Sequence, residues 1–326
     1  MTLTLIVLAA ALVIDRIVGD PPKLWERLPH PVVVFGRAIS FVDRLFNAKR
    51  MTPETRRFNG AVAIGALLAA SMLAGSVIHG LLGLLGWPGL VLEAAVVALF
   101  LAQKSLADHV GAVADGLRQD GLAGGRRAVS MIVGRDPATL DEPAVCRAAI
   151  ESLAENFSDG VVAPALWYAL LGLPGLLAYK MLNTADSMIG HRNAKYLEFG
   201  WAAARLDDLA NWPAARLSIV LIALGARVAI GGWAARAALD LALRDSGLHR
   251  SPNSGWPEAA MAGALGLGLA GPRVYGGVRV DEPMMNAAGR TAATPDDIRR
   301  GIAVFNRACD ALVLFALAGA ALAAIV

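Results

Sequence analysis

Charged residues are scarce in this chain. Asp, Glu, Lys and Arg make up 17% of its 326 residues, against about 25% in soluble domains, while 56% are hydrophobic and the mean hydropathy is +0.53. This deficit excludes an ordinary soluble domain and predicts a membrane protein. The net charge is only +3, and the few aromatic residues (6%) are not interleaved with Lys or Arg. We therefore expect no nucleic acid as a partner.

Cysteine is scarce, and the sequence shows neither the features of a cleaved signal nor a P-loop. Cys146 and Cys309 are far apart and lack metal-ligand spacing, which argues against a disulfide framework or a zinc site. No basic segment precedes the apolar N-terminus, so we expect a retained first membrane helix over 2–19. The GxxxxGK[ST] pattern does not occur. Residues 266–271 match GxGxxG but follow no predicted strand, which favours close helix packing over a dinucleotide fold.

Several apolar segments approach the roughly 20 residues that a membrane span needs. Residues 58–92 contain no Asp, Glu, Lys or Arg and are interrupted by Gly86-Trp87-Pro88-Gly89. This pattern predicts a helical hairpin, with helices over 59–86 and 89–107 and a tight turn on the outer side. Glu93, near the start of the second helix, is expected to be interfacial. With 2–19 and further spans over 213–234 and 311–326, we expect about six spans in all.

The polar segments between these spans are expected to be cytoplasmic helices and loops. The loop 20–57 is rich in Lys and Arg, so the positive-inside rule places it in the cytoplasm. The remaining polar segments are predicted as a helical segment at 104–150 with turns at 121–127 and 134–137, helix and turn at 181–212, a loop at 235–257, a short helix at 258–271, a turn at 275–277 and an amphipathic helix at 295–310. The predicted fold is an all-α, polytopic integral membrane helix bundle forming a single domain, 1–326.

One apolar segment is unusual. Residues 160–179 carry no charge, but Pro164, Gly172 and Pro174 interrupt them. Such broken segments are tolerated where the backbone lines a cavity. A straight span would separate the polar residues on its two sides, whereas a broken or re-entrant hairpin would bring them together. We prefer the broken or re-entrant form.

Acids, amides and cations gather around this segment, between 151 and 216. They comprise Glu155, Asn156 and Asp159; Asn183 and Asp186; Asp207, Asp208 and Asn211; and Lys180, Arg192, Arg205 and Arg216. Ionisable residues near membrane depth are typical of a functional site. Arg147, Glu151, Glu155 and Asp159 also recur at steps of four, which places them on one helix face. A solvated stripe of ion pairs would explain Arg147 and Glu151 without any function.

An ordered set of motifs resembles one family, the adenosylcobinamide-phosphate synthases of the CbiB/CobD type. The matching residues run nearly end to end. They are Gly19-Asp20-Pro21, His30-Pro31, Gly36, Glu155-Asn156, Asp159-Gly160, Pro164, Lys180, Asn183-Thr184, Asp186-Ser187-Met188, Gly190, Tyr196, Phe199-Gly200, Ala204-Arg205, Asp207-Asp208, Asn211, Arg216, Asn253-Ser254-Gly255, Ala262-Gly263-Ala264 and Tyr275-Gly276-Gly277. The family usually has D-D-x-x-N-x-x-P-A-R, and here the proline falls one place early, as Pro213.

The resemblance implies a multi-pass enzyme of late cobalamin biosynthesis in the cell (inner) membrane, with its active site facing the cytoplasm. It would join a carboxylate of (adenosyl)cobyric acid to (R)-1-amino-2-propanol O-phosphate, or to aminopropanol, in a ligase reaction that uses ATP and Mg²⁺. The implied partners are the corrinoid and aminoalcohol phosphate substrates, the lipid bilayer, and a possible complex with other late cobalamin-pathway membrane enzymes.

Residue chemistry allows roles to be assigned within that reaction. Carboxylates suit Mg²⁺ or a proton acceptor, amides suit the many amides of a corrin, and Lys and Arg suit phosphate. We predict catalytic roles for Glu155, Asp159, Asp186 and Asp208, magnesium binding by Asp186, Asp207 and Asp208, and substrate binding by His30, Asn156, Lys180, Asn183, Arg192, Arg205, Asn211, Arg216 and Asn253. For each acid, a structural ion pair is the competing interpretation.

Two other functions remain open from the sequence. Asp207-Asp208-Leu209-Ala210-Asn211 has the form of the box that binds Mg²⁺-diphosphate in prenyl transferases, with Asn183–Asp186 as a second box. Against this, about six spans are fewer than intramembrane prenyl transferases have. A non-catalytic solute transporter or sensor would also contain broken helices and intramembrane acids.

Overall fold

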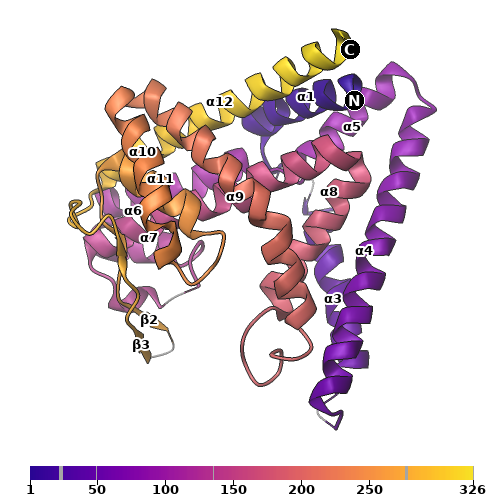
Figure 1. The fold of residues 1–326 in the computed structure, drawn as a ribbon, viewed down its shortest axis with the longest axis horizontal. Coiled ribbons are helices and arrows are strands. Elements are labelled where there is room, and N and C mark those ends of the chain that lie inside the picture. The colour runs from indigo at the N-terminus through magenta and orange to yellow at the C-terminus, as the bar shows by residue number, and fades with distance from the viewer. Residues whose placement is uncertain (22–24, 49, 135, 276–277, 326) are drawn as a thin grey trace. The chain divides into compact units, whose positions relative to one another are not determined.

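The computed structural model describes residues 1–21, 25–48, 50–134, 136–275 and 278–325. The fold is an all-α polytopic bundle of the predicted class (Figure 1). Five helical segments of the described chain are long and apolar enough to cross a membrane: Pro53–Gly83, Trp87–Val129, Glu142–Ile189, Trp201–Ala229 and Pro295–Ile325. The protein is therefore a multi-pass membrane protein. The predicted first membrane helix, α1 (Thr2–Val18), has 17 residues, fewer than the about 20 of a typical span.

The chain forms two compact units, each described here by itself. Unit 1 comprises Met1–Leu101, Ala163–Asn211 and Gly319–Val326; unit 2 comprises Ala102–Val162 and Trp212–Ala318. Unit 1 contains α1, α3 (Pro31–Phe46), α4 (Pro53–Gly83), α5 (Trp87–Ala98), α8 (Ala163–Ile189) and the start of α9 (Trp201–Ala229). Unit 2 contains α6 (Gln103–Val129), the 3₁₀ turn η1 (Pro137–Thr139), α7 (Glu142–Phe157), the π-helix η2 (Ser158–Val162), the rest of α9, α10 (Gly232–Asp245), the 3₁₀ turn η3 (Ser246–Leu248), α11 (Gly255–Leu265) and most of α12 (Pro295–Ile325).

The predicted hairpin in unit 1 is confirmed, with one correction. The turn lies at Gly86, whose φ of 64° is in the left-handed region that glycine adopts readily. Pro88 lies in the first turn of α5, where proline is tolerated. The second helix ends at Ala98 and not at 107, because the backbone turns at 99–102 before α6 begins. The helix α4 runs beside α8 and α3 (Figure 1). Gly75 permits this approach, since a Cβ there would collide with the backbone at Leu173 and Pro174.

The broken segment is also confirmed. After the π-helix η2, α8 is interrupted at Gly172, with φ 65° and ψ −156°, and Pro174 follows in the next turn. That backbone conformation is essentially open only to glycine. The polar residues before the break (155–159) belong to unit 2 and those after it (183–186) to unit 1. The proposal that the break brings them together therefore stays a prediction.

Of two predicted breaks in unit 2, one is confirmed and one is wrong. The turn predicted at 121–127 begins at Gly121 (φ 60°), which divides α6 into two helices, and the backbones at Gly116 and Gly124 on its two sides come into contact. The loop predicted at 235–257 contains helix α10, whose residues Ala234, Ala238 and Leu241 form a buried stripe. This stripe packs on α11, where Gly263 lets the backbone at Ala237 come close. Charged residues on the opposite face hid this amphipathic pattern.

The segment that follows α11 differs from expectation as well. The helix ends at Gly266, which has the left-handed conformation of a C-terminal cap (φ 69°, ψ 31°), and not at 271. Residues 266–271 thus leave a helix and enter strand β1 (Leu269–Ala270), so close helix packing does not explain their glycines. β1 pairs antiparallel with β4 (Met284–Met285), and β2 (Arg273–Tyr275) pairs with β3 (Val278–Val280). The turn predicted at 275–277 lies partly outside the described residues, and so does one residue of the turn predicted at 134–137. The helix predicted from 295 to the end of the chain is confirmed as α12.

Candidate functional site

A buried ladder of hydrogen bonds joins α8 to α9 in unit 1. The Tyr179 hydroxyl donates to Asn211 Oδ1 at 2.8 Å, and Asn211 Nδ2 donates to Asp207 Oδ2 at 2.9 Å. Asn211 is 1% exposed and Asp207 8%. Positions 207 and 211 share a helix face, which aims both side chains at α8. A carboxylate held in such a place needs these hydrogen bonds, because burying an unpaired charge is unfavourable.

The other predicted acids of unit 1 lie around this ladder. Asn183 lies beside the Asp207 carboxylate, and Asp186 is close enough to interact electrostatically with both Asp207 and Asp208. Asp186 and Asp208 are half-buried, so they are open to a ligand in a way that Asp207 is not. The helix spacings therefore bring three predicted acids and two predicted amides into one cluster, which we call the acid cluster: Asn183, Asp186, Asp207, Asp208 and Asn211.

Cations complete the acid cluster. Arg192 and Arg205 act electrostatically on Asp208, and His191 acts on Asp186. Arg192 and Arg205 are exposed. Two guanidinium groups beside half-buried carboxylates form a surface that suits a phosphate together with its counter-cation.

The donor chemistry of the acid cluster fits Mg²⁺, though not as a preformed cage. Carboxylate oxygens are the ligands that Mg²⁺ prefers, and it is usually held by one or two of them plus substrate phosphates. Within the described part of the chain, no three His, Cys, Asp or Glu side chains are arranged to hold a metal ion. Asp186 and Asp208 are the accessible pair that could do so together with a phosphate.

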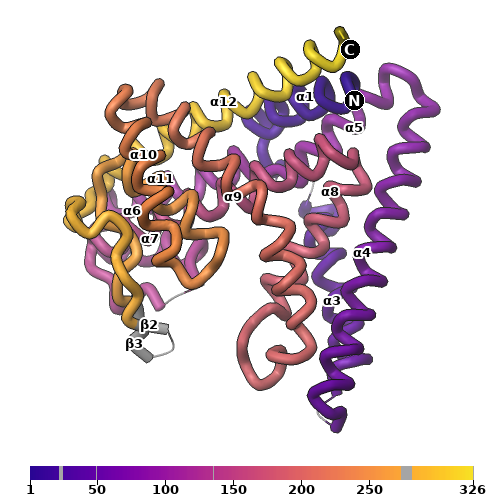
Figure 2. Tube along the Cα trace, viewed as in Figure 1, coloured from indigo at the N-terminus to yellow at the C-terminus, as the bar shows by residue number. Residues whose placement is uncertain are grey.

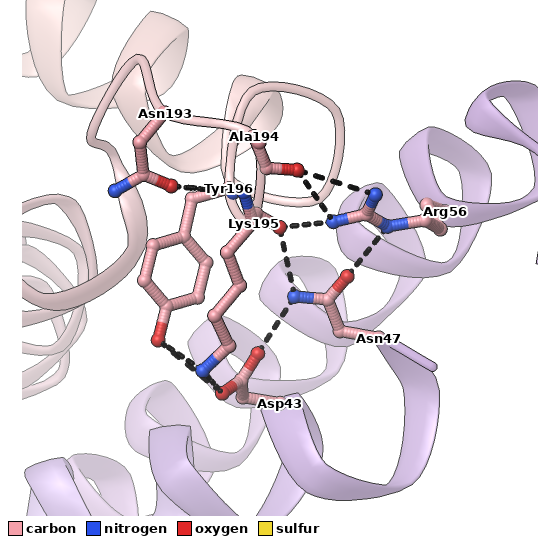
Figure 3. Close-up of polar contacts among 7 residues, drawn as sticks. All are labelled: Asp43, Asn47, Arg56, Asn193, Ala194, Lys195 and Tyr196. Atoms are coloured by element: carbon pink, nitrogen blue, oxygen red, sulfur yellow. Dashed lines mark hydrogen bonds and ion pairs between the residues drawn. The ribbon is translucent and has the colours of Figure 1, made fainter. Parts of the chain in front are cut away.

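The loop between α8 and α9, residues 190–200, carries His191 and Arg192. Figure 2 shows the chain leaving α8, turning through this loop and returning as α9. Figure 3 shows how the loop is fastened to α3 and α4: Arg56 donates to the carbonyls of Ala194 and Lys195 and to Asn47, which itself donates to the Lys195 carbonyl at 3.2 Å.

An ion pair adds to this attachment. Lys195 Nζ lies 2.8 Å from Asp43 Oδ2 (Figure 3). The hydrogen bond to Asp43, and a second one to the Tyr196 hydroxyl, raise the pKa of Lys195 above its ordinary value. Lys195 therefore stays charged at physiological pH. The attachment gives Arg192 a defined position beside the acid cluster.

Unit 2 contains a second group of predicted residues. Arg216 Nη1 donates to Asn253 Oδ1 at 2.9 Å, and the neighbouring Ser254 Oγ donates to Glu155 Oε1 at 2.9 Å. The guanidinium carbon of Arg216 lies 4.7 Å from the ring centroid of Trp212 and 4.6 Å from that of Trp256. Neither tryptophan was expected from the sequence, although Trp212 stands one helical turn before Arg216, a spacing that could have indicated the contact.

Asn156 lines a cavity of about 450 Å³ in the same unit. Its Nδ2 donates to the Ser152 carbonyl at 2.9 Å. Ser105 and His109 also line this cavity, and His109 Nδ1 donates to the Ser105 carbonyl at 2.7 Å. Because a carbonyl only accepts, Nδ1 carries the proton and Nε2 is the acceptor in the neutral ring. His109 had no motif to mark it in the sequence.

Some residues prove to have structural contacts. His30 caps α3, since its Nδ1 accepts from Val32 N at 3.2 Å. Arg147 donates to the Thr291 carbonyl, and Glu151, only 5% exposed, accepts from Ala270 N at 2.8 Å. The solvated stripe of ion pairs is therefore wrong for Glu151, which holds β1 against α7. Lys180 is half-buried on α8, and Asp159 lies in the π-helix, a feature often found at functional sites.

Glu93 is buried among the helices of unit 1, and its interfacial position in the membrane stays a prediction. It is 4% exposed, accepts from the Tyr168 hydroxyl at 2.7 Å and lies 2.8 Å from His79 Nδ1. These contacts join α5 to α8 and α4. The partners come from helices far apart in the sequence, which is why the sequence did not predict them.

Comparison with known proteins places this chain in a family. The family model described as CobD/Cbib protein matches residues 8–305. The chain is 68% identical to the cobalamin biosynthesis protein CobD of a Sinorhizobium species, over 96% of this chain and 97% of that protein. It is 56% identical to the protein of the same name in Brucella suis (94% and 93% covered) and 44% identical to that of Rhodobacter capsulatus (94% of both covered). No solved structure matches the chain.

Proposed function

The chain belongs to the CobD/CbiB family and acts in late cobalamin biosynthesis, and from this premise we propose the reaction that it catalyses. It joins a carboxylate of (adenosyl)cobyric acid to the amine of (R)-1-amino-2-propanol O-phosphate, giving adenosylcobinamide phosphate at the expense of ATP. The prenyl-transferase and transporter interpretations gain no support, since the relatives are named as cobalamin biosynthesis proteins along nearly the whole chain.

The chemistry needs an activated carboxylate, because the oxygen of a free carboxylate is a poor leaving group. In the proposed first step a carboxylate oxygen attacks the γ-phosphorus of ATP, forming an acyl phosphate and releasing ADP. In the second step the amine attacks the acyl carbon, phosphate leaves and the amine proton passes to a base. The site must therefore neutralise phosphates, position an amine and accept one proton.

The acid cluster of unit 1 suits the phosphates. Arg192 and Arg205 are exposed and charged, and their guanidinium groups can donate paired hydrogen bonds to phosphate oxygens. Mg²⁺, when bound, would neutralise phosphate charge, and Asp186 and Asp208 would hold it. Asp207 and Asn211 are buried and bonded to each other, so we assign them to positioning these groups. One observation supports this phosphate site: the accessible acids and the two guanidinium groups lie next to the buried hydrogen bonds of Tyr179, Asn211 and Asp207.

Unit 2, taken by itself, contains residues whose chemistry suits an amine and a corrin amide. Glu155 and Asp159 are half-buried acids that can accept the amine proton. The exposed Asn156, beside its cavity, can hydrogen-bond a corrin amide. The active site is proposed to face the cytoplasm from the inner membrane, where ATP is supplied, and the enzyme to work beside other late membrane enzymes of the pathway.

The proposal is tested by product formation with purified protein in detergent. Cobyric acid, aminopropanol phosphate, ATP and Mg²⁺ should give a product with the mass of cobinamide phosphate, together with one ADP. Asp208→Ala should lower the rate by about 100-fold or more, because it removes an accessible acid of the cluster. The matched control is Asp108→Ala, which removes an exposed acid paired with Lys104 on α6 and should leave the rate unchanged.

Absence of any amide product from the wild-type protein under these conditions would refute the proposed reaction. A wild-type rate for the Asp208 variant would instead remove only Asp208 from the site. Both variants should reach the membrane in normal amounts, which immunoblotting of the membrane fraction checks.

A further inference from the structure

An apolar groove lies in unit 1 between three helices, each of which belongs to a segment long and apolar enough to cross a membrane. Its volume is about 280 Å³, and it is lined by residues of α4, α8 and α9. The residues of α8 that line it include Gly175 and Ala178, whose small size leaves the space open. Met72 of α4 and Leu209 of α9 line its sides and are exposed. The groove therefore opens to the surroundings of the helices.

The lining of this groove excludes a polar ligand. Only two of its side chains carry a nitrogen or oxygen atom, and each of these atoms has a partner in the protein. The Tyr179 hydroxyl donates to Asn211, and Trp167 Nε1 donates to the Ala210 carbonyl at 3.1 Å. Nucleotides, phosphates and corrin amides need hydrogen bonds that this lining does not offer. Because the surrounding helices are of membrane-spanning length, the apolar molecule at hand is a lipid.

A cation and an aromatic ring lie where α4 and α9 begin. The guanidinium carbon of Arg57 is 3.9 Å from the ring centroid of Trp201, so a cation–π contact orients it. Among the described residues, no hydrogen bond or ion pair uses this exposed guanidinium, and its N–H groups are open to a ligand. Arg57 directly precedes the segment 58–92, which has no charged residue. Arginine and tryptophan at the end of such a segment are typical of the lipid headgroup level.

The spacing between this cation and the groove matches one half of a bilayer. Leu68, which lines the groove, follows Arg57 on the same helix by a distance of about 16 Å, given the rise per residue of an α-helix. The hydrocarbon core is about 30 Å thick, so each leaflet is about 15 Å deep. On α9, Leu206 follows Trp201 by about 8 Å. A chain attached to a headgroup at Arg57 therefore reaches the groove within one leaflet.

We propose that the groove binds one acyl chain of an anionic phospholipid whose phosphate lies on Arg57. A guanidinium donates paired hydrogen bonds to phosphate oxygens, and it repels the ammonium group of a zwitterionic headgroup, so an anionic lipid is preferred. The bound chain contacts Tyr179, whose hydroxyl holds Asn211 in the acid cluster. The inference goes beyond the proposed function and does not depend on it, because no substrate takes part in this binding.

Native mass spectrometry of the full-length protein in detergent, without substrates, tests the inference. Protein stripped of lipid is titrated with palmitoyl-oleoyl phosphatidylglycerol, which is anionic, or with the zwitterionic phosphatidylcholine of the same chains. Wild-type protein should retain one phosphatidylglycerol and bind it more tightly than phosphatidylcholine. Arg57→Gln should weaken phosphatidylglycerol about 10-fold and remove the preference, because charge-assisted hydrogen bonds to the phosphate are lost.

A second variant tests the groove itself. Ala178→Leu adds apolar bulk at a half-buried lining position of α8, so it should weaken both lipids about 10-fold or more by filling the space of the chain. Should this variant fail to fold, a short-chain lipid replaces it. Dihexanoyl phosphatidylglycerol has the same headgroup but chains too short to fill the groove, and wild-type protein should bind it more weakly than the long-chain lipid.

Matched controls lie in the same loop and on the same helix. Arg50→Gln removes an exposed arginine that precedes α4, and Ala66→Leu adds the same bulk as Ala178→Leu at an exposed position of α4 that does not line the groove. Both should leave the two affinities unchanged.

Four results would overturn the inference. They are a wild-type protein that retains no phospholipid, equal losses in the controls, lipid binding that neither Arg57→Gln nor Ala178→Leu weakens, and a lipid-free dimer, which would mean that a second copy covers the groove. Each of them leaves the proposed amide synthesis untouched, since that reaction is measured separately by product mass. Conversely, a protein that makes no amide but binds phosphatidylglycerol through Arg57 would refute the reaction and keep this site.

Discussion

At the scale of single residues, the acid cluster combines two kinds of carboxylate. Asp207 is buried and held by Asn211, which is held in turn by Tyr179. Asp186 and Asp208 are half-buried and lie beside cationic side chains. A buried, hydrogen-bonded acid is suited to fixing geometry, while an accessible one is suited to a ligand. We therefore expect mutations of the buried residues to affect stability and mutations of the accessible acids to affect activity.

Removing the hydroxyl of Tyr179 should show how much the buried hydrogen bonds between α8 and α9 stabilise the protein. Tyr179→Phe leaves Asn211 Oδ1 without its 2.8 Å donor in a buried site, and should lower the free energy of unfolding by about 1–3 kcal/mol. Thermal unfolding in detergent measures the loss. Tyr196→Phe is the comparison: the Tyr196 hydroxyl accepts from Lys195 at an exposed position where water can replace it, so stability should change by only about 0.5 kcal/mol. Equal losses in the two variants would contradict a special role for the buried ladder.

At the scale of elements, the interruption of α8 depends on one glycine. Gly172 has φ 65° and ψ −156°, and Pro174 follows it, so the segment cannot continue as a straight helix. The break also lies beside the approach of α4, where Gly75 meets the backbone of Leu173 and Pro174. A change in the break would therefore disturb the packing of α4 as well.

Gly172→Ala should destabilise the protein by about 1–3 kcal/mol, because alanine is strained in that backbone conformation. The matched control is Gly65→Ala in α4, where an added Cβ would meet nothing within 4 Å and where alanine favours a helix. The control should be neutral or slightly stabilising. The measurement is the thermal unfolding midpoint of each variant in detergent. Similar midpoints for the two variants would mean that alanine at position 172 is not strained.

The loop 190–200 is held in place by residues of α3 and α4 and of the connection between them. Arg56 and Asn47 bind its carbonyls, and Asp43 pairs with Lys195 (Figure 3). The loop carries Arg192, which acts on Asp208. The position of Arg192, for which we propose phosphate binding, thus depends on contacts of its loop with α3 and α4.

Arg56→Gln should release this loop while leaving the helices folded. Hydrogen exchange of the amides at 193–197 should become faster, because the carbonyls that Arg56 held no longer restrain the backbone. Amide synthesis should fall with it if Arg192 needs its present position. Arg44→Gln, an exposed arginine on α3, is the control and should leave both measurements as in wild type. Faster exchange without loss of synthesis would show that the loop does not position a functional residue.

At the scale of the whole molecule, the chain is a multi-pass membrane protein with two compact units. The basic loop predicted at 20–57, which in the structure contains helix α3, predicts which side of the membrane the polar groups face, since Lys and Arg are retained in the cytoplasm. The turn between α4 and α5 is then expected on the outer side. Leu84, in that turn, is 82% exposed, and Glu26 is exposed in the basic loop.

Cysteine labelling tests this orientation in a background that lacks the two buried native cysteines, Cys146 and Cys309. In intact spheroplasts, an impermeant maleimide should label Leu84→Cys but not Glu26→Cys. Opening the inner membrane should make Glu26→Cys reactive, because the basic loop lies inside. The opposite labelling pattern would place the loop on the outer face and contradict the proposed orientation of the polar groups.

Much of this could be predicted from the order of amino acids. The charge-free segments predicted an α-helical membrane protein, Gly86 and Pro88 predicted the hairpin, and Gly172 with Pro174 predicted the broken segment. These succeed because hydropathy and backbone restriction act locally along the chain. The family also followed from an ordered set of short motifs. Helix α10 was missed because the charges on its exposed face obscured its buried alanine stripe.

The sequence by itself determined which residue types this protein has available for chemistry; only the tertiary structure decided which of them meet. Asp207 and Tyr179 are joined through Asn211, and Arg216 contacts Trp256, which lies 40 residues further along the chain. Likewise, His30 caps a helix and Glu151 holds a strand, roles that their motifs did not predict. The physical reason is that burial and hydrogen bonding depend on contacts between distant segments, whereas helix period and hydropathy depend on neighbours in the sequence.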